Sequence, residues 1–260
     1  MNKLPLNIKL LLGVFLASIT SSFGTVTTAP VGYVTETIKP AGFNLIASNL
    51  SGSVVASGAF GTADATTATD VDASFTTSLA GSSDYVLTLT SGTNVGVNTG
   101  VTASSATVLA TDDDLSSLVS DGDTYEIRNV LTIADLFGAD NSAELEGATA
   151  GNTSNADIVW VQTATGYTKV YYNAVARPFP PLSVGWKGTT TGGADASTTP
   201  VYFTDAIWVQ VQRSAFSADE EGVDPSDLTS KDIVLTGSVV THSSEVAAES
   251  GFNYMNRIFP

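Results

Sequence analysis

The chain is built from short alternating segments rich in Thr, Val and other β-branched residues, and these segments are separated by clusters of Gly, Asn, Asp and Ser. The 3.6-residue apolar period of an amphipathic helix is almost absent. β-branched side chains fit a pleated sheet, and the small polar clusters are typical of turns between antiparallel strands. The pattern predicts an all-β fold, an antiparallel β-sandwich or barrel of about eleven strands with one or two short helices.

The expected strands follow from alternation and from short apolar runs. The segment TYEIRN alternates so that Tyr125 and Ile127 share one face, and WVQTATGYTKV has the form of a hairpin. The expected strands cover residues 32–38, 43–47, 53–60, 85–90, 107–110, 124–130, 157–162, 167–173, 202–211, 232–240 and 252–259.

Two short helices are expected between these strands. Thr132 is a helix N-cap, Asp135 completes a capping box, and Gly138 ends the helix. A second helix is expected from Thr111 to Gly122, with acidic residues at the positive end of its dipole. Residues 61–83 and 188–199 carry few large apolar side chains, which predicts loops, the second of them mobile.

The first 24 residues have the pattern of a secretory signal peptide. Lys3 and Lys9 flank an apolar run from Leu10 to Ile19, and small residues lead to an expected cleavage site after Gly24. The apolar run is about half the roughly 20 residues that a membrane-spanning helix needs. We therefore expect an exported protein with no transmembrane helix, displayed outside the cell or at its surface. Residues 25–260 show no clear linker and are expected to form a single β-rich domain.

Charge and composition exclude several function classes. The formal net charge is −16, which repels phosphate backbones, so nucleic acid is not an expected partner. The absence of cysteine excludes thiol catalysis and Cys-rich metal sites. A Ser–His–Asp hydrolase would need His242, the one histidine, but no nucleophile motif such as G-x-S-x-G is present. We expect a non-catalytic protein without an obligate cofactor.

Calcium is the one metal that the acidic residues suggest, because it prefers oxygen ligands. The candidate ligands cluster in two stretches of the sequence, TDDD and SDGD. The EF-hand pattern is not met, and both stretches have an alternative interpretation as helix-terminal charge and turn. The candidates are Asp112, Asp113, Asp114, Asp121 and Asp123, with a second acidic cluster at Asp219, Glu220, Glu221 and Asp224.

Aromatic residues offer a candidate platform for stacking against sugar rings. The alternative is that Trp160 and Trp208, which lie among apolar strand residues, belong to the core and that the tyrosines lie at sheet rims, and this is the expectation we favour. The platform candidates are Trp160, Tyr167, Tyr171, Tyr172, Trp186 and Trp208.

The two ends of the mature chain share a short motif. Gly-Phe-Asn followed by an apolar residue occurs at residues 42–45 and 251–254, which predicts that the first and last strands lie near each other. Residues 25–38, TVTTAPVGYVTETI, carry Glu36 as their only charge and form a β-prone segment after cleavage. Such a segment can add to the sheet edge of a neighbouring subunit.

Several segments in this order resemble an uncharacterised family of secreted β-rich proteins found mainly in verrucomicrobia and planctomycetes. They are TAPVGYVTETI, GFNLIASNL, YEIRNVLTIADLFG, WVQTATGYTKVYYN, Trp186-Lys187 and GFNYMNRIFP. The resemblance implies export and a single β-rich unit, and it implies no catalytic residue.

Together these features predict a non-catalytic extracellular structural protein, a cell-surface, matrix or filament subunit that self-associates by strand addition. The alternative is a β-sandwich module that binds calcium or polysaccharide.

Overall fold

The computed structural model describes residues 31–39, 42–47, 50–80, 84–163, 166–212, 230–241 and 245. These residues form eighteen strands and two short helices, which confirms the all-β class. The strands lie in four sheets, none of which closes on itself, as in the sandwich alternative. Every strand pair is antiparallel except that of β12 (Ala148–Thr149) with β14 (Gly166–Val175). No helix of the described residues has the length and apolar character needed to cross a membrane.

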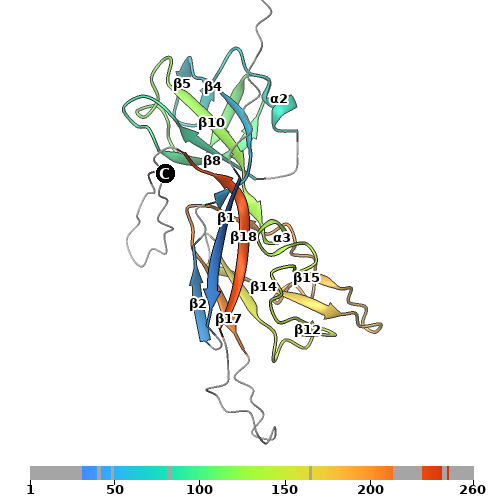
Figure 1. Ribbon diagram of the computed structural model, residues 1–260. Coiled ribbons are helices and arrows are strands. Elements are labelled where there is room, and N and C mark those ends of the chain that lie inside the picture. The colour runs from blue at the N-terminus through green and yellow to red at the C-terminus, as the bar shows by residue number, and fades with distance from the viewer. Residues whose placement is uncertain are drawn as a thin grey trace, which may run out of the picture.

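The strands form two regions along the long axis of the molecule (Figure 1). The upper region comprises residues 54–129, and the lower region comprises residues 31–51 and 131–239, so that the upper region is an insertion between two parts of the lower one. The upper region is one seven-stranded sheet, in the order β4 (Val54–Ala59), β10 (Thr124–Asn129), β7 (Tyr85–Leu89), β8 (Asn98–Ser104), β9 (Val108–Thr111), β6 (Thr67–Thr69) and β5 (Thr62–Ala63).

The lower region pairs a three-stranded sheet with a six-stranded one. The three-stranded sheet is ordered β1 (Val31–Ile38), β18 (Lys231–Val239) and β3 (Leu50–Ser51). The six-stranded sheet is ordered β12 (Ala148–Thr149), β14 (Gly166–Val175), β13 (Ile158–Thr163), β17 (Ile207–Val211) and β2 (Gly42–Ile46), with β15 (Gly185–Gly188) paired to β14. A two-stranded sheet joins β11 (Leu131–Thr132) to β16 (Pro200–Val201).

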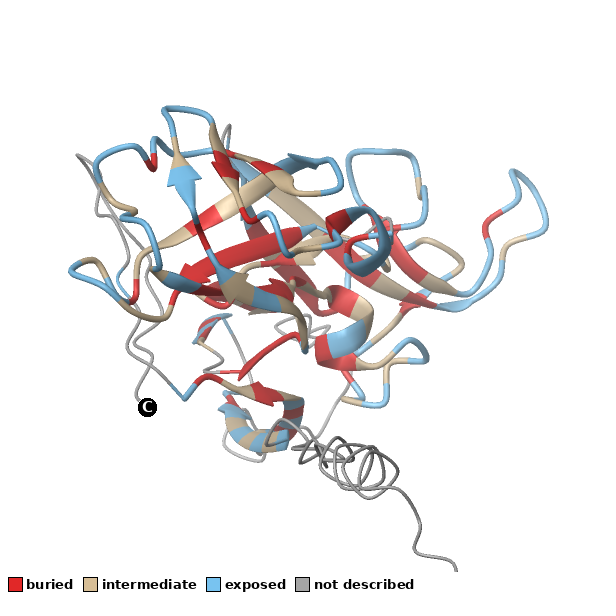
Figure 2. Ribbon diagram, turned by 90° about the horizontal axis from the view of Figure 1, so that it is seen from above, coloured by how far each residue is buried: buried red, intermediate tan, exposed pale blue. Residues whose placement is uncertain are grey.

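The lower core lies between the three-stranded and six-stranded sheets. Ile233 and Leu235 of β18 belong to the same buried cluster as Val159 of β13 and Val209 of β17. Because successive strand residues point to opposite faces, each of these strands gives the core only alternate side chains. Viewed from above, burial follows the strands while the connecting loops are exposed (Figure 2).

Two opposed glycines in the three-stranded sheet leave space for a buried side chain. Gly32 of β1 lies opposite Gly237 of β18 in the register. A Cβ atom on Gly32 would lie 2.7 Å from Leu50 Cδ2, and one on Gly237 would lie 2.8 Å from Leu50 Cβ. The missing side chains therefore leave the space that the buried Leu50 of β3 fills.

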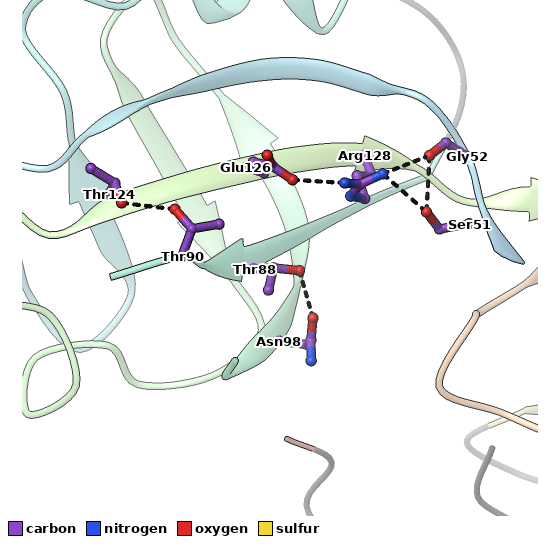
Figure 3. Close-up of polar contacts among 8 residues, drawn as sticks. All are labelled: Ser51, Gly52, Thr88, Thr90, Asn98, Thr124, Glu126 and Arg128. Atoms are coloured by element: carbon purple, nitrogen blue, oxygen red, sulfur yellow. Dashed lines mark hydrogen bonds and ion pairs between the residues drawn. The ribbon is translucent and has the colours of Figure 1, made fainter. Parts of the chain in front are cut away.

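Apolar packing and hydrogen bonds both join the two regions. Val86 of the upper region clusters with Val130, Phe203 and Val240. Beside this cluster the buried Arg128 bonds to Glu126 at 2.8 Å and to Ser51 Oγ at 3.2 Å (Figure 3). Since Ser51 belongs to the lower region, this guanidinium ties the end of β10 to the strand where the insertion begins.

The predicted capping box at Thr132 is confirmed. Helix α3 (Ile133–Phe137) starts after Thr132, whose Oγ1 accepts from the Asp135 backbone N–H at 3.2 Å, while Asp135 Oδ2 accepts from the Thr132 backbone N–H at 2.9 Å. Gly138 ends the helix at a φ of 84°, a conformation that favours glycine. Ile133, Leu136 and Phe137 are buried, so α3 covers one part of the lower core.

Three local predictions were wrong. Residues 111–122 contain turns and no helix; Thr111 Oγ1 instead donates to the Asp113 carbonyl at 3.0 Å. Residues 61–83 contain β5, β6 and helix α2 (Phe75–Ser78), because small Thr and Ala side chains pair in the sheet and Phe75 anchors the segment in the upper core. The expected strand 202–211 begins only at Ile207.

The segment 188–199, expected to be a mobile loop, contacts the lower core. Its Ala196 is buried in that core, and the carbonyls of Ser197 and Thr199 accept from the backbone N–H groups of Ala134 and Ile133. These bonds satisfy donors that a helix N-terminus leaves without intrahelical partners. The segment therefore supports α3.

Candidate ligand-binding groove

The outer face of the six-stranded sheet carries large aromatic side chains. On β17, Ile207, Val209 and Val211 are buried, while Trp208 and Gln210 are half-buried on the opposite face. The same alternation places Trp160 of β13 on the outer face and Val159 and Val161 in the core. On β2, Phe43 and Leu45 are 54% and 48% exposed. The alternation that builds the core thus places these aromatic rings toward solvent.

Strand register aligns the outer residues into a row across four strands. Leu45 of β2 lies opposite Trp208 of β17, Trp208 lies opposite Trp160 of β13, and Trp160 lies opposite Lys169 of β14. Directly opposed residues in antiparallel strands have Cβ atoms about 4.5–5.5 Å apart. The row is therefore continuous and runs across the strands.

Four aromatic side chains enclose an open groove of about 340 Å³: Phe43, Trp160, Tyr167 and Trp208. The Phe43 ring is edge-on to Trp160, with centroids 5.7 Å apart, and to Trp208, at 6.1 Å. Trp160 is edge-on to Tyr167 at 6.0 Å. Because the interplanar angles are 69° to 89°, the rings form the walls of a notch and not one flat platform.

Polar groups fix Trp160, the central ring of the groove. Its Nε1 donates to Gln210 Oε1 at 3.0 Å, which sets the ring orientation. Lys169 Nζ lies 3.8 Å from the centroid of the same ring, a cation–π contact. Gln162 is exposed and lies opposite Tyr167. The strands that carry the aromatic lining thus also carry two amides and one ammonium group close to the rings.

The groove strands differ from the rest of the chain in charge. The sequence contains 26 acidic residues, but none lies in β2, β13, β14 or β17. Lys169 is the only ionisable residue of these strands other than tyrosine. The face is consequently neutral to weakly basic on a strongly acidic protein.

The expectation that Trp160 and Trp208 belong to the core holds only in part. Both are half-buried on the outer face and line the groove, and Trp160 packs against a small buried cluster of Ala148, Ala156, Ile158 and Tyr171. The sequence contains a signal for this placement. In WVQ of β13 and WVQ of β17, a glutamine follows each tryptophan by two residues, so ring and amide share a face. Phe43 was absent from the predicted platform, although its alternation with the buried Asn44 and Ile46 marks it as outward-facing.

Three other predicted platform residues do not contribute to the groove. Trp186 is 1% exposed, and its Nε1 donates to the Gly138 carbonyl at 2.8 Å. Tyr172 packs edge-on against Trp186 at 5.3 Å, on the core side. Tyr171 is buried, and burial raises the pKa of its hydroxyl, opposed by the nearby charge of Arg177. The aromatic residues of this sheet are therefore divided between its two faces.

The calcium candidates are not gathered into a ligand set. Asp114 Oδ1 accepts from the Ser116 backbone N–H at 2.9 Å, and the hydrogen bonds from the Ser116 hydroxyl and backbone lower the pKa of Asp114. Asp123 Oδ2 accepts from the Ser120 backbone N–H at 2.8 Å. The backbone N–H groups of Asp112 and Asp113 bond to the Gly100 carbonyl and to Thr99 Oγ1. The contacts of Asp114 and Asp123 are those of turns, and the contacts of Asp112 and Asp113 join the end of β9 to β8.

Within the part of the chain that the structure describes, no three His, Cys, Asp or Glu residues lie close enough to hold a metal ion, and Asp121 is exposed. The second acidic cluster, at residues 219–224, His242 and the second Gly-Phe-Asn motif lie outside the described residues. The calcium site stays a prediction of the sequence.

The chain matches no protein-family model, no curated protein and no solved structure. The family resemblance seen in the sequence therefore stays a prediction, and function has to be argued from the groove.

Proposed function

We propose that this chain is a non-catalytic, exported protein that binds a neutral polysaccharide in the groove of Phe43, Trp160, Tyr167 and Trp208. The observation that carries the proposal is that four aromatic side chains line an open groove on a sheet face. Ligand sites combine apolar and aromatic walls with a few oriented polar groups. Monomeric proteins seldom expose such a patch without a use for it.

The aromatic and polar side chains at the groove suit a sugar better than they suit a polyanion. A pyranose ring presents apolar C–H faces to aromatic rings and hydroxyls to its rim, where Gln162, Gln210 and Lys169 offer donors and acceptors. The net charge of −16 disfavours polyanions such as nucleic acids, and so a neutral chain is the expected ligand.

A binding role, without cleavage, is supported by the composition of the groove strands. Hydrolysis of a glycosidic bond generally uses two carboxyl groups, about 5–10 Å apart, on either side of the bond. The four groove strands contain no Asp or Glu. The proposal combines this role with the structural one expected from the sequence: a cell-surface or matrix protein that holds polysaccharide in place.

Native affinity electrophoresis tests the proposal. The full-length protein is run in gels that contain soluble neutral polysaccharides such as xylan, mannan and β-glucan, and at least one should retard it. Trp160→Ala removes the central ring of the groove and should weaken retardation about tenfold or more, equivalent to about 1.4 kcal/mol.

Phe179→Ala is the matched control. Phe179 is 87% exposed but does not line the groove, so its loss removes an exposed aromatic ring without changing the site. Retardation of this variant should equal that of the wild type. Absence of retardation in every polysaccharide, or equal loss in both variants, would contradict the proposal.

A further inference from the structure

Most edge strands of the described sheets are short. An edge strand exposes backbone N–H and C=O groups that can pair with another chain, and natural proteins limit this risk with short strands, bulges, Lys or Pro. The edge strands β3, β5 and β12 have two residues each. The edge strand β2 has five residues and the edge strand β4 has six, and the register of β4 with β10 shifts between Ile127 and Arg128. β1 differs from all of these.

β1 is the longest edge strand of the described sheets. Its eight residues pair with β18 without a register shift, and within the described residues the β1 backbone has no other recorded hydrogen-bond partner. The strand contains neither Lys nor Pro, and Glu36 is its only charged residue. A regular strand of this length without protection is a template for a further strand.

The solvent-facing side of β1 also carries exposed apolar side chains. Tyr33 is 72% exposed and Val31 is 65% exposed, and Val234 on the neighbouring β18 is 52% exposed. Thr35 lies opposite Val234, so these side chains form one surface. The backbone edge and the apolar surface are adjacent, which is the arrangement expected where a second sheet continues the first.

We propose that β1 is an interface between two copies of this chain, in which the two β1 strands pair antiparallel about Val34 and join two three-stranded sheets into one of six. This inference goes beyond polysaccharide binding and does not depend on it. It also differs from the exchange of residues 25–38 expected from the sequence, because Val31–Ile38 remains paired with β18 of its own chain.

The β1 sequence is complementary to itself in this register. Val34 meets Val34 of the second copy, Tyr33 meets Thr35, and Val31 meets Thr37. Glu36 meets Gly32, so no like charges are directly opposed. A strand of different sequence would not have this match with β1, so a second copy of the chain is the expected partner.

The net charge of −16 on each copy opposes association over long range. Salt screens charges that are more than about 8–10 Å apart, whereas backbone pairing at contact distance is little affected. Association through β1 should therefore become stronger as ionic strength rises.

Sedimentation velocity of the full-length protein, over a wide concentration range and at low and high salt, tests the interface. The wild type should show a dimer that increases with concentration and with salt. The double variant Tyr33→Lys, Thr35→Lys places two lysines on the edge strand and should weaken dimerisation about tenfold or more.

The double variant Thr102→Lys, Ser104→Lys is the control, because both residues are exposed on β8, an interior strand of the upper sheet that does not belong to the proposed interface. It adds the same charge and should change dimerisation by less than about threefold. Hydrogen exchange of residues 31–38 in the wild type, which needs no variant, should slow at high concentration. A wild type that is monomeric at every concentration and salt, equal losses in both double variants, or concentration-independent exchange would overturn the proposal.

Discussion

The upper region keeps its aromatic rings in the core, whereas the lower region buries some rings and places others on an outer face. In the upper region Phe60 and Tyr125 stack at a centroid distance of 4.2 Å inside the core, and Phe75 packs beside them. Elsewhere in that sheet, polar side chains bond between neighbouring strands, as with Thr90–Thr124 at 2.8 Å and Thr88–Asn98 at 2.5 Å (Figure 3). In the lower region Trp160 and Trp208 lie on the outer face.

This difference shows that exposed aromatic rings are not a general consequence of a small-residue, β-rich composition. The upper region exposes Thr, Ser and Asn and keeps its aromatic rings in the core. A β-sheet of this chain can therefore pack without exposed tryptophan. The outward rings of the lower region are those to which the proposed binding role is assigned, whereas the buried rings of the upper region contribute to its core.

The largest predicted effect is on the stability of the upper core. Phe60 is 1% exposed, and Phe60→Ala should cost about 3–5 kcal/mol of unfolding free energy because it leaves a cavity beside Tyr125. Denaturant unfolding followed by circular dichroism measures this cost. A cost near that of a surface substitution would mean that the upper ring cluster is not a structural core.

The second prediction concerns the buried pair of Tyr125 and Asp70. The Tyr125 hydroxyl donates to Asp70 Oδ2 at 2.7 Å, and Tyr125→Phe should cost about 1–3 kcal/mol because it leaves a buried carboxylate without this donor. Burial, then the hydrogen bond to Asp70 and the charge of Asp70, raise the pKa of Tyr125 above its ordinary value.

The sign of the pH effect follows from that shift. Unfolded Tyr125 releases its proton near pH 10 while folded Tyr125 retains it, so its contribution is complete below about pH 10 and is lost as the pH rises further. Urea titrations between neutral and alkaline pH should show a smaller alkaline loss in Tyr125→Phe than in the wild type. Identical pH profiles would show that Tyr125 does not contribute in this way.

The third prediction uses Phe43 as the counterpart of Phe60. Phe43 is 54% exposed and makes two edge-on ring contacts, so Phe43→Ala should cost only about 1.5 kcal/mol or less. The same variant should weaken polysaccharide retardation, which Phe60→Ala does not target. If Phe43→Ala destabilised the fold as much as Phe60→Ala, the exposed ring of the lower region would contribute to stability as much as the buried ring of the upper region, contrary to the proposed difference.

The smallest predicted effect is at the cap of α3. Thr132→Ala removes the side-chain acceptor of the capping box and should cost about 1 kcal/mol. Thr37→Ala is a matched control, because its hydroxyl bonds to Asp232 at 2.7 Å on an exposed strand, where the cost should stay within about 0.5 kcal/mol. Thermal unfolding of the two variants resolves the difference. Equal shifts would show that the cap does not contribute to the stability of the lower region.

The sequence predicted those parts of the fold that local patterns determine. Residues 85–90 and 124–130 alternate clearly, and they form β7 and β10, with Tyr125 and Ile127 both buried. The hairpin of β13 and β14 and the cap at Thr132 were also confirmed, because each depends on a few adjacent residues.

Other elements depend on long-range pairing and could not be predicted in this way. β8 contains NTGVTAS, which has little apolar signal, and it is a strand because β7 and β9 flank it. The pairing of β1 with β18 joins the first and last described strands, and no local pattern specifies its register. The prediction drawn from the repeated Gly-Phe-Asn motif stays a prediction, because its second copy lies outside the described residues. The groove likewise appears only when β2, β17, β13 and β14 are aligned.

Tryptophan fluorescence during titration with a polysaccharide that retards the protein tests the central claim most directly. The chain has three tryptophans; Trp160 and Trp208 line the groove, and Trp186 is buried elsewhere. Saturable change in emission, abolished in a Trp160→Phe, Trp208→Phe variant that retains Trp186, is the predicted result. A titration that leaves the emission unchanged, or one whose response persists in that variant, would contradict a binding role for the groove.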